Sequence, residues 1–176
     1  MRVNQTVVIV SAVIVTGAGL VLAGCKDDGT NPEAVPVQVT DAQLFAMQQP
    51  VSGWVFFSNT TDTLFSGGNT GHESRLRVRY NAHAATQLDV GGRVKTGAVF
   101  PDSSLIVKDL YTNGVRTTVA YMFKLAAASN AAAGGWVWAE TDDAGIPKAS
   151  AALKGVGCTG CHSPGIDFTR MNDAHP

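Results

Sequence analysis

Two cysteines and one histidine near the end of the chain stand at a spacing that suits a specific chemistry. They form the run Cys158-Thr159-Gly160-Cys161-His162. On a helical turn, two thiols at this spacing can reach the two vinyl groups of one porphyrin, and the following imidazole can then ligate the iron. The Cys-x-x-Cys-His pattern therefore predicts one covalent haem c, attached through Cys158 and Cys161 and with His162 as the axial iron ligand.

A redox-active cysteine pair and a structural zinc site are two other uses of a Cys-x-x-Cys pair, and neither accounts for the whole Cys-x-x-Cys-His run. A redox-active pair has no need of a histidine directly after it. A structural zinc site needs further ligands at close spacing, and of the 3 cysteines in the chain the remaining one, Cys25, lies near the N-terminus. Each cysteine thus has a separate use, and no disulfide is expected.

The N-terminus has the pattern of a secretory signal. Arg2 precedes an apolar run over residues 7–21, which is short for an uncleaved membrane span. The run ends in Leu22-Ala23-Gly24-Cys25, which resembles a bacterial lipobox. That resemblance implies cleavage before Cys25, lipidation of its thiol and attachment to a membrane through acyl chains. Lys26 after it favours the outer membrane, on the periplasmic or cell-surface side.

These patterns divide the chain into three parts. Residues 1–24 form the signal peptide, residues 25–36 the lipidated cysteine with a polar, flexible tether, and residues 37–176 the haem domain. The chain carries a formal net charge of −1, from 13 basic and 14 acidic residues. No basic tract stands out, so the composition gives no support for binding to nucleic acid.

Most of the haem domain has the pattern of β-strands. Residues 75–80 alternate, with Leu76, Val78 and Tyr80 on one face and three arginines on the other. Further strands are predicted over residues 54–57, 105–110, 117–124 and 136–140. Short helices are predicted over residues 81–90, capped by Asn81, and over residues 147–155. We therefore expect a mainly β fold of the α+β type, an antiparallel sheet with a few short helices and the haem motif near the C-terminus.

Short motifs precede and follow the haem motif in a characteristic order. They are Arg77, Tyr80-Asn81, Phe100-Pro101-Asp102, Val107-Lys108-Asp109, Met122, Lys124, Gly135-Trp136 and Asp167-Phe168-Thr169-Arg170. Only 14 residues follow His162, whereas small electron-carrier cytochromes c have their haem motif near the start. The order resembles the cytochrome P-460 family and its relative cytochrome c′-beta, over roughly residues 54–171.

The resemblance implies a mainly antiparallel β protein, often a homodimer, with a five-coordinate haem. His162 would be the proximal ligand, and the distal side would be open to small nitrogen species. The P-460 members oxidise hydroxylamine, with nitric oxide as a related ligand or product, and such redox chemistry implies a redox partner protein. In these members a lysine is also bonded to the porphyrin edge. By motif position this lysine is Lys108, and the distal arginine is Arg77.

Both positions also have an ordinary structural interpretation. On a strand, Lys108 shares a face with Ile106 and Leu110. Burial there would lower its pKa and leave a neutral, nucleophilic amine, but a lysine on an edge strand can instead extend its amine into water. Arg77 lies between Arg75 and Arg79 on the polar face of its strand, which is also typical of a solvated surface.

One departure from the P-460 pattern bears on activity. These enzymes use a distal carboxylate to accept protons from hydroxylamine, but residues 122–126 contain no acid. A positioned base contributes roughly 10²–10⁴-fold in rate, and Glu140 is a substitute that the sequence does not place. Three functions therefore stay open: a hydroxylamine-oxidising enzyme, a c′-beta-like protein that binds nitric oxide without turnover, and a surface electron-transfer cytochrome. A distal side lined by Phe100 or Phe123 would favour the second.

An electron carrier would need a sixth iron ligand from the protein. The available donors are Met47, Met122, Met171, His72, His83 and His175. Met122 is expected in the core, Met171 follows the haem motif too closely to reach the opposite side of the haem easily, and His72 and His83 are expected on the surface. Trp136 and Trp138 share a strand face and are expected in the core or against the haem.

Overall fold

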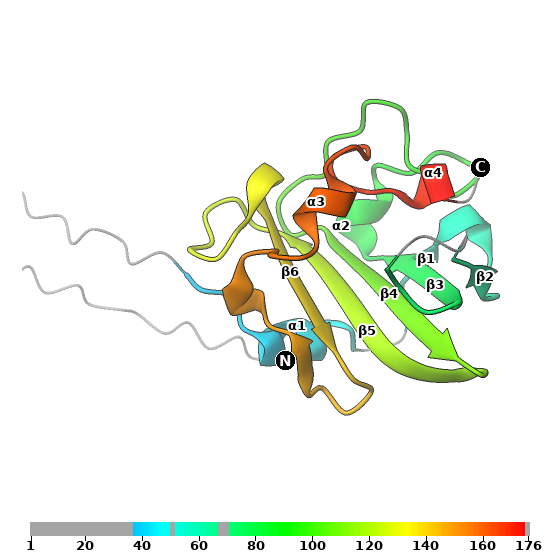
Figure 1. The fold of residues 1–176 in the computed structure, drawn as a ribbon. Helices are drawn as coiled ribbons and strands as arrows, with labels where there is room; N and C mark the ends of the chain where they lie inside the picture. The colour runs from blue at the N-terminus through cyan, green and yellow to red at the C-terminus, as the bar shows by residue number, and fades with distance from the viewer. Residues whose placement is uncertain (1–36, 50–51, 67–70, 175–176) are drawn as a thin grey trace, which may run out of the picture. The chain divides into compact units, whose positions relative to one another are not determined.

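One antiparallel sheet of seven strands forms the framework of the described residues (Figure 1). The computed structural model describes residues 37–49, 52–66 and 71–174, so the predicted signal peptide, Cys25 and the tether lie outside the described residues. The strands follow the order β1-β3-β4-β5-β6-β7, and β2 also pairs with β3. They are β1 (Val55–Phe56), β2 (Leu64–Phe65), β3 (Arg75–Tyr80), β4 (Leu105–Thr112), β5 (Val115–Lys124), β6 (Trp136–Thr141) and β7 (Pro147–Ala149). The predicted mainly β fold is confirmed.

The central strands form where the alternating patterns predict them. β3 spans the predicted residues, and β4, β5 and β6 each contain the predicted segment with one or two further residues. Asn113 and Gly114 connect β4 to β5 with positive φ angles of 52° and 81°. Two positive φ angles are typical of the tight turn that suits the twist of a β-hairpin. The first predicted strand is shorter than expected, since Phe57 begins a 3₁₀ helix, η1 (Phe57–Asn59).

The helices are short. They are α1 (Asp41–Met47), α2 (Ala82–Ala85), α3 (Thr159–His162) and α4 (Met171–Ala174), with further 3₁₀ helices η2 (Ala133–Gly135) and η3 (Ala151–Leu153). Asn81 caps α2 as predicted, because its side chain accepts a hydrogen bond from the Ala84 N–H at 2.9 Å. The helix ends well before the predicted residue 90. Nowhere in the described ranges is a helix both long and apolar enough to cross a membrane.

The predicted helix over residues 147–155 is wrong. These residues instead form β7, which pairs antiparallel with β6, and then η3. The preceding turn provides the reason. The Asp142 carboxylate accepts hydrogen bonds from the backbone N–H groups of Ala144 and Ile146, at 2.9 and 2.8 Å. Such a turn reverses the chain and aligns Pro147 with the edge of the sheet.

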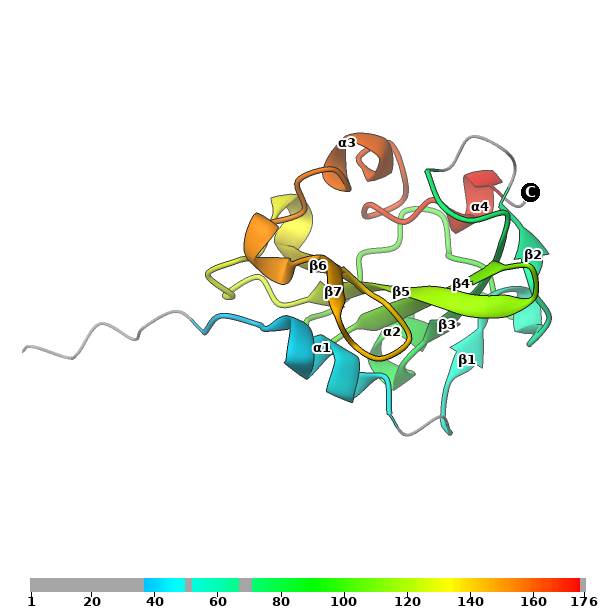
Figure 2. The ribbon, with the colours of Figure 1, turned by 60° about the horizontal axis from the view of Figure 1, so that its bottom comes forward.

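The two faces of the sheet have separate apolar cores. In Figure 2, α3 and α4 lie on one side of the sheet and α1 lies on the other. The core of the α3 face includes Leu76, Val78, Tyr80, Ile106, Met122, Trp136 and Trp138. The core of the α1 face includes Leu44, Val107, Tyr121, Phe123 and Val137. Side chains that alternate along a strand therefore reach two different environments.

The arginine face of β3 is not a solvated surface. Arg79 is only 2% exposed and Asp109 is fully buried. Asp109 receives three guanidinium groups, from Arg77 at 3.1 Å, Arg79 at 3.3 Å and Arg116 at 3.0 Å. Shared pairing of this kind compensates for the cost of burying a carboxylate, and it fixes the charged side chains on the α1 face.

Candidate functional site

A cavity of about 280 Å³ lies between the α3 face of the sheet and the C-terminal segment. This volume is close to the lower limit of ligand and cofactor pockets, roughly 300–1,000 Å³. Cys158, Cys161 and His162 line it from the haem motif. The sheet contributes apolar side chains from β3 to β6, together with two charged ones, Lys108 and Glu140. The structure therefore brings the predicted haem ligands and Lys108 into one cavity.

Residues 158–162, the predicted haem motif, form a single helical turn. Cys158 precedes α3, and Cys161 and His162 lie within it. Both cysteines are free thiols. Gly155 brings the chain to this point with a φ of 70°, and a Cβ atom there would lie 2.7 Å from Trp138 Cδ1. Close packing against Trp138 therefore requires glycine at this position.

The imidazole of His162 is fixed through one of its nitrogens. Its Nδ1 lies 2.9 Å from the carbonyl oxygen of Phe168, so Nδ1 carries the proton and donates it. Trp138 packs edge-to-face on the ring, with centroids 4.8 Å apart. Burial also lowers the pKa of His162. A neutral imidazole with Nδ1–H on a backbone carbonyl and Nε2 unprotonated is the usual state of a metal-bound histidine.

The segment after the haem motif is anchored by Asp167. Its carboxylate pairs with Lys124 Nζ at 2.9 Å, and both side chains are only 10% exposed. The same residue accepts hydrogen bonds from the Phe100 backbone N–H at 2.8 Å and from Trp136 Nε1 at 3.0 Å. Phe168 then adopts a φ of 67°. A non-glycine residue in this region is strained, and here its carbonyl is held against His162.

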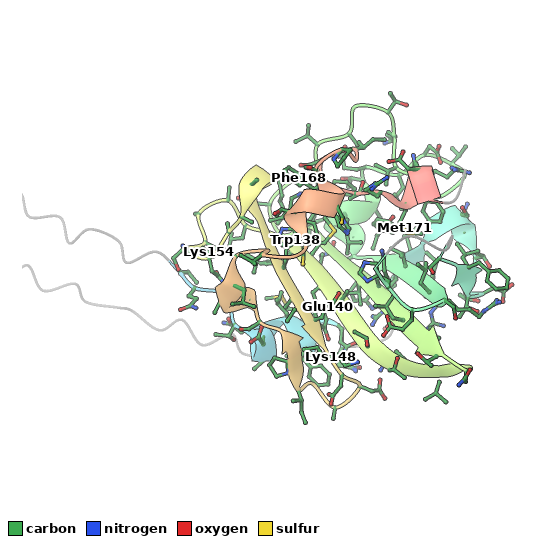
Figure 3. The ribbon with its side chains drawn as sticks, in the orientation of Figure 1. Trp138, Glu140, Lys148, Lys154, Phe168 and Met171 are labelled. Atoms are coloured by element: carbon green, nitrogen blue, oxygen red, sulfur yellow. The ribbon has the colours of Figure 1, made fainter. Side chains whose placement is uncertain are left out.

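Lys108 and Glu140 occupy the sheet side of the cavity. Burial lowers the pKa of Lys108 to about 8, and the charge of Glu140 opposes this shift. Within the described ranges the Lys108 amine has no hydrogen bond or ion pair, and the one charge that acts on its pKa is that of Glu140. Burial raises the pKa of Glu140. Figure 3 shows Trp138 next to α3 and Glu140 further along the same strand. Lys108 is partly exposed and lines the cavity on the same face as Ile106.

Arg77 lies apart from this cavity. It projects from the α1 face and pairs with Asp109, whereas Lys108 faces the other side of the sheet. The structure therefore does not bring Arg77 together with the haem ligands. Phe100 packs on Trp136 with centroids 5.6 Å apart, and Phe123 belongs to the α1-face core. Neither phenylalanine lines the cavity.

The expected surface position of His72 is wrong. His72 lines the cavity, its side chain is 16% exposed, and its Nδ1 lies 3.7 Å from Glu140 Oε1. Burial, followed by the charge of Lys108, lowers its pKa to about 4. The loop before β3 carries no periodic pattern that would reveal this placement. His83 is exposed as expected. Met122 and Met171 are buried and line the cavity. Met47 is 38% exposed, and His175 lies outside the described residues.

Two polar atoms of the cavity have no partner. Tyr80 Oη and Trp138 Nε1 are buried, and neither forms a hydrogen bond in the described structure. Both residues line the cavity. Unpaired buried donors are costly, and a polar group of a bound molecule could satisfy them. With two thiols, a neutral imidazole and apolar walls at the same place, the residues fit a haem with carboxylate groups. Across the described ranges, no cluster of three or more His, Cys, Asp and Glu side chains is arranged to hold a metal ion directly.

Comparison of the chain with protein-family models, with curated proteins and with solved structures finds no match.

The Asp167 anchor leads to a stability prediction. Asp167→Ala leaves Lys124 buried without a counter-charge, so we expect the free energy of unfolding to fall by about 3–5 kcal/mol. Urea denaturation followed by circular dichroism measures it. The control is Asp173→Ala, which removes the exposed Arg170–Asp173 pair, with side chains 45% and 52% exposed, and should cost less than about 1 kcal/mol. Equal losses in the two variants would contradict the anchor.

Proposed function

We propose that the chain is a monohaem c-type cytochrome of the P-460 type that carries out redox chemistry on small nitrogen species. The proposal rests on one observation: a single cavity is lined by Cys158, Cys161 and His162 and also by Lys108 and Glu140. The first three residues suit covalent attachment and axial ligation. The other two suit chemistry on a small ligand beside the iron.

The two thiols determine how the haem would be held. Addition of each S–H across a vinyl group forms a thioether, so the haem cannot dissociate from an exported protein. His162 would supply the proximal nitrogen through Nε2, since Phe168 occupies Nδ1. When bound, the haem supplies an iron centre that accepts electrons and binds small ligands. Tyr80 and Trp138 offer it unpaired hydrogen-bond donors.

Lys108 distinguishes the P-460 enzymes from ordinary cytochromes. Its lowered pKa, about 8, leaves an appreciable fraction of neutral amine at neutral pH, and only the neutral amine is a nucleophile. The resemblance assigns this lysine a bond to the porphyrin edge. An amine without an ion-pair partner in the described residues, placed in the same cavity as the haem motif, supports that assignment.

Glu140 supports an enzyme rather than a passive trap. Oxidation of hydroxylamine releases protons, and a nearby carboxylate can accept them. Burial raises the pKa of Glu140, which brings a proton acceptor closer to neutral pH. Glu140 therefore takes the place of the proton-accepting carboxylate that is absent from residues 122–126. Neither Phe100 nor Phe123, the residues expected to line the distal side of a nitric oxide trap, lines the cavity.

Electron transfer is the second candidate function. It is favoured by His72 and Met171, two side chains in the cavity that can ligate iron. In either case we propose that lipidated Cys25 tethers the haem domain to a membrane, on the periplasmic or cell-surface side, and that a redox partner protein exchanges electrons with it. A homodimer belongs to the same proposal.

The absorption spectrum tests the assignment of Lys108. For protein produced in a host that matures c-type haem, we expect a broad, strongly red-shifted ferrous Soret band, which marks an additional bond to the porphyrin. Lys108→Met should return an ordinary c-type spectrum, whereas Lys154→Met, at an exposed lysine, should not. An ordinary spectrum for the unaltered protein would exclude the cross-link and leave nitric oxide binding or electron transfer.

Turnover tests the role of Glu140. Glu140→Gln keeps the shape of the side chain and removes the proton acceptor, so hydroxylamine oxidation should slow by roughly 10²–10⁴-fold. Stopped-flow reduction of an electron acceptor measures the rate. Glu73→Gln is the control, because the Glu73 carboxylate accepts a hydrogen bond from the Thr118 hydroxyl at 2.6 Å and does not line the cavity. Full activity of the Glu140 variant would exclude this carboxylate as the base.

A further inference from the structure

Tyr80 carries a buried hydroxyl group that has no partner. The side chain is fully buried and lines the cavity, and its Oη forms no hydrogen bond in the described structure. The core to which the ring belongs consists of apolar side chains. Phenylalanine would fill the same space at lower cost, because a buried hydroxyl without a partner is destabilising. The hydroxyl is therefore available to an acceptor atom of a bound molecule.

The register of the sheet places Tyr80 at one end of a row of side chains that crosses four strands. The row runs through directly paired residues: Tyr80 on β3, Ile106 on β4, Met122 on β5 and Trp138 on β6. All four line the cavity. With about 4.8 Å between neighbouring strands, the backbones of Tyr80 and Trp138 are roughly 14 Å apart. The two unpaired donors of the cavity therefore serve different groups.

His162 contacts the same row at its other end. Its ring packs edge-to-face on Trp138, with centroids 4.8 Å apart. Between that end and Tyr80 the row contains two apolar side chains, Ile106 and Met122. An axial imidazole leaves the opposite side of an iron open to a small ligand, and hydrogen-bond donors on that side decide how the ligand is held. Tyr80, at the end of the row remote from His162, has the position of such a donor.

We propose that the Tyr80 hydroxyl donates a hydrogen bond to the small nitrogen ligand on the haem iron and so selects ligands whose free end accepts one. The inference rests on the proposed function, because it needs a haem held by Cys158 and Cys161. It deepens that function by naming a residue that touches the ligand and differs from Lys108 and Glu140. It also agrees with a five-coordinate haem whose distal side is open.

The chemistry of Tyr80 agrees with this role. Burial raises the pKa of Tyr80, so the hydroxyl keeps its proton at physiological pH and is a donor. A haem carboxylate is a poorer match, because an anion buried among apolar side chains needs more than one neutral hydroxyl to compensate for its desolvation. A neutral small ligand needs a single donor.

Tyr80→Phe gives the test, since phenylalanine keeps the ring and its packing and removes only the hydroxyl. In full-length protein with matured haem, infrared spectroscopy of the ferrous carbon monoxide complex should show the C–O stretch at higher frequency, because loss of a donor weakens back-donation from the iron. Stopped-flow spectroscopy should show nitric oxide dissociating about 2- to 10-fold faster, the effect of one neutral hydrogen bond. The control is Tyr111→Phe, at a tyrosine that does not line the cavity, and it should change neither value.

The stability of the ligand-free haem protein gives a second readout. Tyr80→Phe removes a hydroxyl that has no partner in the described residues, so the urea midpoint should stay the same or rise. A clear fall in the midpoint would show that the hydroxyl bonds the protein itself, and it would overturn the inference.

The outcomes separate the inference from the proposed function. A pyridine haemochrome assay measures covalent haem in each variant. Covalent haem with an unchanged C–O stretch and an unchanged dissociation rate in Tyr80→Phe would overturn the inference alone. The same result with a changed reduction potential would assign the hydroxyl to a haem carboxylate and would also overturn it. Unaltered protein without covalent haem would overturn the proposed function together with the inference.

If Tyr80→Phe does not mature, the unaltered protein decides. Transfer from H₂O to D₂O shifts the C–O stretch of the carbon monoxide complex when an O–H group donates to the ligand. The inference predicts this shift, and an identical stretch in both solvents would contradict it.

Discussion

The geometry of the site depends on the buried ion pair between Lys124 and Asp167. This pair joins the end of β5 to the segment that follows the haem motif, and Phe100 and Trp136 donate to the same aspartate. The next residue, Phe168, is thereby held in a strained conformation with its carbonyl on His162. A backbone carbonyl in a fixed position determines which nitrogen of the imidazole can reach a metal. The imidazole of His162 is therefore oriented by the sheet, although it lies on a short helix outside it.

Strand β4 carries a paired charged side chain on one face of the sheet and an unpaired one on the other. Adjacent residues of β4 project to opposite faces, so Asp109 receives three arginines on the α1 face while Lys108 has no ion-pair partner on the α3 face within the described ranges. The first arrangement is stable and structural. The second lowers the pKa of Lys108 and costs stability, and perturbed groups of this kind in cavities often perform chemistry.

Alternation along the strands made the framework predictable, because one apolar face and one polar face fix both the strand and its orientation. The same pattern placed Lys108 with Ile106 correctly. It could not reveal that Arg79 is buried against Gln48, or that Arg77 and Arg79 pair with Asp109, since these contacts depend on residues distant in sequence. Strand β7 was missed because pairing with the edge of β6 outweighs local helix propensity. His72 was misplaced for a similar reason: its loop has no periodicity, and only tertiary contacts bring it to the cavity. Glu140 was recognised as an acid on a strand, but its position in the cavity follows from the register of β5 and β6.

The central claim is that Cys158 and Cys161 hold one haem covalently, and intact-protein mass spectrometry tests it most directly. Protein matured in a host that attaches c-type haem, and then extracted with acidified acetone, should keep the mass of one haem. A Cys158→Ser/Cys161→Ser double variant should lose that added mass. A polypeptide that keeps no haem after extraction, with both thiols open to alkylation, would contradict the account.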